Sequence, residues 1–185
     1  MVGLIPKLLL DLVTAKGGES AAAEVKRRAE APDAPFRIDT VYPDELWQRL
    51  LRASCEVLAV SQEEAESLYA DFFGRDALAR WPVWFAMSKN ARQLLERQPI
   101  IHNTFATGVR DADARRGIAD KFHIEKREHE LVVHYRSPNQ LCGLYVALAR
   151  WVLDHYGEHA TVEQARCAKR GDPECVIHVR WEPVT

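Results

Sequence analysis

The spacing of apolar residues predicts helices throughout the first part of the chain. Apolar positions between residues 4 and 12 recur at helical spacing, and a second amphipathic run predicts a helix from Pro43 to about Ala59. Ser61 precedes a third run and has Glu64 three residues later, which is the spacing of a capping box. Residues 1–106 are therefore expected to form a helical subdomain.

Breaker residues divide this helical region further. Gly74 is expected to end or bend the third helix, and Ser88 to cap a helix that runs through Leu95. Pro99 predicts the first turn of another short helix, in the segment PIIHNTF. The charged stretch RDADARRG, residues 110–117, is predicted to be a solvated loop that connects this region to the next.

From residue 121 onward, strand-like alternation replaces the helical spacing. FHIEKREHELVVHYRS predicts two strands with a turn between them, and residues 140–156 predict a helix with Gly157 as its C-cap. TVEQARCAK and ECVIHVRW predict two more strands joined by a hairpin turn at RGDP. We therefore expect an α+β fold in one domain, residues 1–185, whose α/β subdomain spans residues 121–185.

Composition excludes several classes of protein. The 185 residues carry a formal net charge of −2, so there is no basic surplus to attract nucleic acid. No apolar run reaches membrane-spanning length, and the N-terminus lacks the basic region of a signal peptide. We therefore expect a cytoplasmic protein, bound to neither membrane nor nucleic acid, whose four cysteines are reduced thiols or metal ligands.

The sequence contains none of the common catalytic signatures that we sought. It has no phosphate-binding glycine loop, no G-x-S-x-G, no H-E-x-x-H and no EF-hand loop. We therefore do not expect an enzyme.

Two groups of residues could form a ligand site. Tyr135, Ser137 and Asn139 are spaced two apart at the end of a predicted strand, so their side chains share one face, which is either a binding site or a solvated edge. His102 lies among apolar residues on the short PIIHNTF helix. A neutral imidazole surrounded by apolar residues suits haem iron or another metal. A core histidine that is hydrogen-bonded to a carbonyl would show the same sequence pattern.

The cysteines form a third group. Cys167 and Cys175 flank the RGDP turn, and Cys142 begins the preceding helix. A tetrahedral zinc site needs a fourth ligand, for which His159 and His178 are candidates and Gln164 is a poor one. The alternative is three buried thiols that pack as small apolar residues.

Several motifs together resemble the haem nitric-oxide/oxygen-binding (H-NOX) family, the sensor domain also found in soluble guanylate cyclases. They are the MVG start, YPDELW, the upstream lone histidine, YRSP after a strand, and CAKRGDPEC, and they span nearly the whole chain. The resemblance implies a helical half packed on a C-terminal antiparallel sheet with one long helix. It also implies haem b, with His102 as axial ligand of the iron and Tyr135 and Ser137 binding the propionates.

The chain departs from the family's Tyr-x-Ser-x-Arg motif at its third position, where Asn139 replaces the arginine. An arginine offers a fixed charge and a two-pronged grip on a carboxylate. Losing such a charge-assisted contact removes about 1.5–3 kcal/mol. Arg115 or Arg116, in the predicted loop, could supply the charge instead.

The resemblance also places Ile5, Leu78, Leu144 and Leu148 on the open, distal face of the iron, although plain core packing explains them equally well. None of them can donate a hydrogen bond, which favours NO and CO over the more polar bound O2. NO would weaken the iron–His102 bond, and the two halves would then shift. Because the chain ends soon after its last strand, we expect it to signal to a separate histidine kinase, diguanylate cyclase or chemoreceptor.

Two alternatives use the same fold. The first is a haem-free domain that binds another apolar small molecule, which the loss of the motif arginine at Asn139 favours. The second is a redox sensor based on Cys142, Cys167 and Cys175. Some bacterial members of the family bind zinc at these positions with a fourth histidine, which is Gln164 in this chain.

Overall fold

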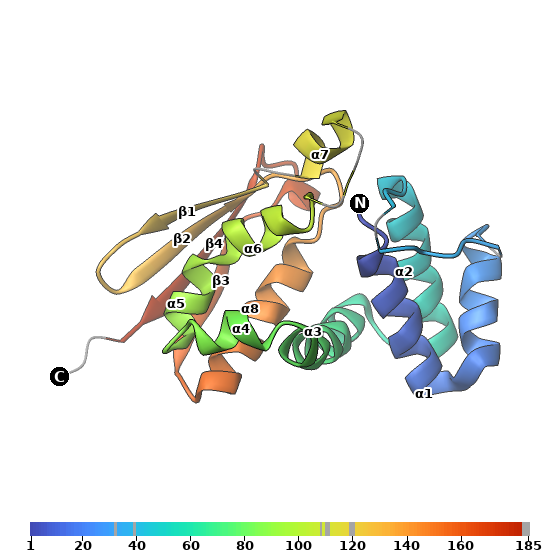
Figure 1. The fold of residues 1–185 in the computed structure, drawn as a ribbon, viewed down its shortest axis with the longest axis horizontal. Coiled ribbons are helices and arrows are strands. Elements are labelled where there is room, and N and C mark those ends of the chain that lie inside the picture. Colours follow the sequence, from blue (N-terminus) through green and yellow to red (C-terminus); the bar gives the residue numbers. More distant parts are fainter. Residues whose placement is uncertain (32, 39, 108, 110–111, 119–120, 183–185) are drawn as a thin grey trace.

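The computed structural model describes residues 1–31, 33–38, 40–107, 109, 112–118 and 121–182 (Figure 1). No helix within these residues combines the length and the apolar character needed to cross a membrane. The α-helices are α1 (Leu4–Arg28), α2 (Asp44–Leu58), α3 (Gln62–Arg80), α4 (Pro82–Ala86), α5 (Ala91–Glu96), α6 (Gln98–Thr104), α7 (Ala112–Ile118) and α8 (Cys142–Tyr156). A 3₁₀ helix, η1 (Ala168–Arg170), occupies the end of the stretch TVEQARCAK that was predicted to be a strand. The strands are β1 (Phe122–Lys126), β2 (Glu130–Tyr135), β3 (Ala160–Arg166) and β4 (Cys175–Trp181).

The helical half of the molecule is built from α1, α2 and α3. Gly18 interrupts α1 with φ 79° and ψ 176°, a conformation that glycine adopts readily, so α1 consists of two helical segments. The capping box at the start of α3 is confirmed. Ser61 Oγ accepts a hydrogen bond from the Glu64 N–H at 3.2 Å, and the Glu64 carboxylate accepts one from the Ser61 N–H at 2.8 Å.

The second half of the molecule is an antiparallel sheet with helices packed against it. The strand order is β1-β2-β4-β3, and every neighbouring pair is antiparallel. Apolar residues of α5 and α8 form one core with buried side chains of β2 and β4. Figure 1 shows these helices beside the sheet in its left part. The predicted α+β architecture, with a helical half and a strand-strand-helix-strand-strand unit, is confirmed.

Two apolar cores result, one within α1–α3 and one between the sheet, α5 and α8. Helix α3 packs against α8 and links the two. At this contact Gly74 is buried, and a Cβ there would lie 2.4 Å from the Trp151 ring. The prediction that Gly74 ends or bends the helix is therefore wrong, because α3 continues to Arg80 and the glycine allows α8 to approach.

Two further local predictions are wrong. Asn90, not Ser88, caps α5, because its side chain accepts a hydrogen bond from the Gln93 N–H at 2.9 Å, whereas the Ser88 hydroxyl donates to the Trp84 carbonyl. The predicted loop at 110–117 is helix α7 over its described part. Residues 110 and 111 of that stretch lie outside the described residues.

Candidate functional site

A cavity lies where the two cores meet. Its wall is mainly apolar and is built from the N-terminal residues, from α3 to α6, from α8 and from the ends of β1 and β2. The polar side chains that border it are few: Gln98, His102, Lys121, Tyr135, Asn139 and Tyr145. Apolar walls with a small number of placed polar groups are the usual composition of a small-molecule site.

His102 is carried to the cavity by α6. Pro99 lies in the first turn of this helix, as predicted, and the imidazole meets the Phe122 ring of β1 at 5.1 Å between centroids. Its Nδ1 atom is buried and has no hydrogen-bond partner within the described residues. Burial, together with the positive charge of Lys121, lowers the pKa of His102 to about 4. The ring is therefore neutral at pH 7, which is the form that binds a metal.

Tyr135, Ser137 and Asn139 follow one another at the end of β2. Tyr135 borders the cavity, and burial raises the pKa of its hydroxyl, an effect opposed by hydrogen bonds with Ser137 and the Leu141 backbone. The Ser137 hydroxyl, which is not part of the cavity wall, accepts a hydrogen bond from the Asn139 N–H at 3.3 Å. The structure thus brings Tyr135 and Asn139 to the same cavity as His102, with Ser137 directly behind them.

Asn139 is buried and faces Asp44, the first residue of α2. With its amide nitrogen turned toward Asp44, it donates hydrogen bonds to both carboxylate oxygens. The same carboxylate lies 3.0 Å from the α-amino group of Met1. The amide that replaces the family's arginine is therefore already engaged by the protein itself.

Neither proposed substitute for that arginine borders the cavity. Arg115 and Arg116 lie on α7 with exposed side chains, and Arg116 forms an ion pair with Asp113. Sequence reasoning missed Lys121, which lies directly before β1, is only 8% exposed and does border the cavity. The sequence feature that could have identified Lys121 is its position at the start of the predicted hairpin. Its carbonyl accepts a hydrogen bond there from the N–H of Arg136, the residue after Tyr135.

Three of the four residues predicted to be distal line the cavity. Ile5, Leu144 and Leu148 belong to its wall, whereas Leu78 is not among the described residues that line it. Tyr145, which the sequence reasoning did not single out, also lines the cavity, and its buried hydroxyl has no hydrogen-bond partner within the described residues. Its ring contacts Phe122, which in turn contacts His102.

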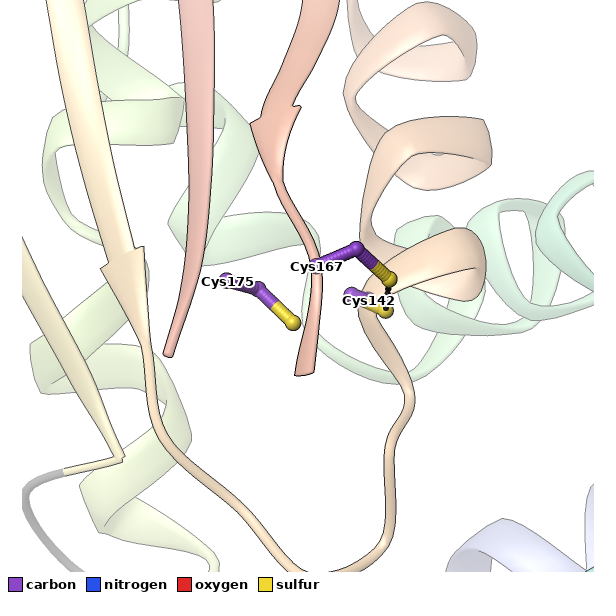
Figure 2. Close-up of side chains that lie close together, drawn as sticks. All are labelled: Cys142, Cys167 and Cys175. Atoms are coloured by element: carbon purple, nitrogen blue, oxygen red, sulfur yellow. Dashed lines mark hydrogen bonds between the residues drawn. The ribbon is translucent and has the colours of Figure 1, made fainter. Parts of the chain in front are cut away.

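The three cysteines converge on one another, as Figure 2 shows, and none of them lines the cavity. Cys142 begins α8, Cys167 follows β3 and Cys175 begins β4, and all three are buried. Their sulfur atoms lie within 4.8 Å of one another, and those of Cys142 and Cys167 are 3.7 Å apart. Three thiolates at such spacing can contribute ligands to a zinc ion.

The cysteine thiols differ in the direction in which their surroundings shift the pKa. Burial opposes ionisation of Cys167, but hydrogen bonds involving the Lys169 backbone and the other two thiols lower its pKa overall. Burial raises the pKa of Cys175 to about 12. Within the described residues no histidine joins the cluster, and His178 instead contacts Glu130 at 2.7 Å. His159 and His178 are therefore not its fourth ligand in this structure, while the Gln164 side-chain nitrogen is buried without a described partner.

Comparison with known proteins agrees with this architecture. The family model for haem-NO-binding domains matches residues 2–164. Among solved structures, the H-NOX domain of Shewanella oneidensis in the Fe(II)CO state is similar with a TM-score of 0.79 at 16% identity, covering 100% of both chains. The unliganded Fe(II) H-NOX protein of K. algicida gives 0.73 at 19% identity, covering 100% of this chain and 98% of that one.

A search of curated proteins found no match. At these low identities the solved structures establish the fold only, whereas the family model covers most of the chain. The chain therefore belongs to the haem-NO-binding family and has the fold of H-NOX proteins.

Proposed function

We propose that this protein is a haem-based gas sensor that binds NO and CO, with His102 as axial ligand of a ferrous haem. The observation that carries the proposal is a neutral, mostly buried imidazole on the wall of an apolar cavity that Tyr135 also borders. Haem combines an apolar macrocycle, an iron that accepts imidazole, and two carboxylates. The cavity offers a matching group for each of these parts, so the residues present fit haem b.

The roles of the residues follow from that fit. His102 would hold the iron, and Tyr135, with Ser137 behind it, would hold a carboxylate by hydrogen bonds. Haem, when bound, supplies the gas-binding iron. The apolar walls exclude water and so strengthen every polar contact inside the site.

His102 is also placed to transmit a change at the site. Its helix α6 has seven residues, and the imidazole rests on Phe122, the first residue of β1. A shift of α6 would therefore move its contact with the sheet. It would also change the cavity that α3 helps to line. Two arrangements of the cores, differing in affinity for the gas, would form a switch. We propose that a separate histidine kinase, diguanylate cyclase or chemoreceptor responds to it, as the resemblance implies.

The selectivity of the site rests on its distal wall. Ile5, Leu144 and Leu148 have no hydrogen-bond donors in their side chains, so they would not stabilise the polar iron–O2 unit, whereas NO and CO need such a donor less. The Tyr145 hydroxyl is the hydrogen-bond donor to test, because it is buried and has no partner in the described structure. We expect no stable O2 complex in air, for either the wild type or Tyr145→Phe. A stable one in the wild type would contradict the selectivity.

The test of the central proposal is replacement of the iron ligand. Reduced, haem-supplemented protein should give a Soret band that shifts with NO. In His102→Gly this band should be lost, and added imidazole should restore it by filling the vacated space. His129→Ala, in the exposed turn between β1 and β2, is the matched control and should behave as wild type. An identical spectrum in His102→Gly would contradict the assignment.

The cysteine cluster supports a second candidate function, a zinc or redox site. Its carrying observation is the convergence of three buried thiols, two of them 3.7 Å apart. Peroxide could accept two electrons and two protons from Cys142 and Cys167, which would leave one disulfide and two waters. Metal analysis and intact-mass measurement after peroxide treatment test the two forms separately. Only trace zinc and an unchanged mass would remove this candidate.

A further inference from the structure

Lys121 occupies an unusual position for a lysine. The residue is 8% exposed, and it is the only lysine or arginine among the described residues that border the cavity. It lies at the open end of the β1–β2 hairpin, where Phe122 pairs with Tyr135 and the Lys121 carbonyl accepts the Arg136 N–H at 3.0 Å. Arg136 itself is exposed and pairs with Glu174 at 2.7 Å, whereas Lys121 faces inward.

The ammonium of Lys121 has no hydrogen bond or ion pair with any residue that the structure describes. Burial lowers its pKa, and only the carboxylate of Asp44 acts in the opposite direction. That carboxylate already contacts the Met1 amino group at 3.0 Å and the Asn139 amide. Burial makes a charge unfavourable unless it is paired, so a carboxylate in the cavity would stabilise the Lys121 ammonium.

Lys121 lies where it could supply the positive charge that the haem-binding motif lacks in this chain. Lys121 precedes Phe122, which pairs with Tyr135 across the hairpin. Lys121 and Tyr135 border the same cavity as Asn139, the residue that lacks the motif's charge. We propose that the Lys121 ammonium binds a carboxylate of the haem and supplies the positive charge that Asn139 cannot. This inference rests on the proposed haem-binding function. A lysine makes a compact point-charge contact through a flexible stem, where an arginine would make a planar, two-pronged one.

Equilibrium haem titration of Lys121 variants tests the proposal. Lys121→Gln should weaken haem binding about 10- to 100-fold, the range for one charge-assisted hydrogen bond. Lys121→Arg, which keeps the charge, should retain most of the affinity. The matched control is Lys126→Gln, at the far end of the strand that Lys121 precedes. The Lys126 ammonium pairs with Glu96 at 2.9 Å outside the cavity, so this variant should bind haem as wild type does.

Haem dimethyl ester identifies the group that Lys121 contacts. Its carboxylates are blocked, so wild type and Lys121→Gln should bind the ester with equal affinity. A loss that persists with the ester would overturn the proposed contact, as would equal binding of unmodified haem by both proteins. Haem binding that depends on His102 but not on Lys121 would leave the proposed function intact. If the wild type binds no haem, both proposals fail together.

Chemical unfolding of the haem-free protein separates this role from a structural one. An unpaired buried ammonium destabilises the fold, so Lys121→Met should raise the denaturant midpoint while weakening haem binding. Lys126→Met should do neither. A lower midpoint in Lys121→Met would mean that the lysine stabilises the apo fold, and it would overturn the inference.

Discussion

The cavity and the cysteine cluster both contain buried polar groups, but the hydrogen-bonding needs of these groups are satisfied to different degrees. In the cluster the thiols interact with one another, and the Cys175 sulfur accepts a hydrogen bond from the Ala168 N–H at 3.2 Å. In the cavity, His102 Nδ1 and the Tyr145 hydroxyl have no partner within the described residues. Buried polar groups without partners are rare in folded proteins, and they indicate where a ligand is expected.

Acidification should affect stability chiefly through the cavity. The pKa of His102 is about 4 in the folded protein and about 6.5 when unfolded, so the unfolded state takes up the proton first as the pH falls. The stability contributed by the neutral ring is complete above about pH 6.5 and is lost progressively as the pH falls toward 4. Each pKa unit corresponds to about 1.4 kcal/mol. Urea unfolding of apo-protein between pH 7 and 4 measures the loss.

The control for this prediction is His102→Leu, which lacks the titrating group. Its stability should fall less steeply over the same pH interval, and the difference from wild type isolates His102. Equal slopes for the two proteins would mean that burial of the imidazole does not govern acid sensitivity.

Disturbing the contact between α3 and α8, which links the two cores, should have the next largest effect on stability. Gly74→Ala places a methyl group 2.4 Å from Trp151, which should reduce the free energy of unfolding by about 1–3 kcal/mol. Adding Trp151→Leu should relieve the overlap, so the double variant should be less destabilised than the sum of the single changes. Additive losses would contradict the packing explanation. Because Gly74 lines the cavity and not the cluster, we expect haem binding to fall while thiol reactivity stays unchanged.

Removing neutral hydrogen-bonding groups should have a smaller effect. Tyr135→Phe and Ser137→Ala should each weaken haem binding about 2- to 10-fold, corresponding to about 0.5–1.5 kcal/mol for one net hydrogen bond. Tyr156→Phe is the control, because its hydroxyl donates to the backbone of Phe85 and Ser88 and is outside the cavity wall. A comparable loss in Tyr156→Phe would show that the effect arises from general destabilisation. Haem titration measures the affinity of each of these variants.

The smallest effect on haem binding should come from the cysteine cluster. Cys142→Ser changes a buried thiol with no part in the cavity wall, so haem affinity should match that of the wild type. It should nevertheless abolish any disulfide formed with Cys167 under peroxide, since the 3.7 Å pair has lost one sulfur. Haem affinity that changes strongly in Cys142→Ser would show that the two sites are coupled.

Local patterns were sufficient to predict much of the fold. The capping box at Ser61 and the left-handed C-cap at Gly157 depend on neighbouring residues only, and both are present. Gly74 was misread because its role is a tertiary contact with Trp151, which local sequence does not encode. Asn90 and Ser88 are both acceptable caps, and the chain uses the one whose side chain reaches the Gln93 N–H.

The candidate site was only partly predictable for the same reason. The spacing and the family resemblance indicated His102, Tyr135 and Asn139, and the structure places all three at one cavity. Lys121 was missed because no motif contains it, and its position at the cavity depends on tertiary contacts that the local sequence does not encode. The helical conformation of α7 could not be anticipated from a charged stretch that was predicted to be a solvated loop.

The most direct test of the central claim is the resonance Raman spectrum of the reduced, haem-reconstituted protein. Protein grown with ¹⁵N-labelled histidine should show an iron–histidine stretching band shifted from its unlabelled position, and His102→Gly should lack that band. An unshifted band, or a shifted band that survives in His102→Gly, would contradict the claim that His102 binds the iron.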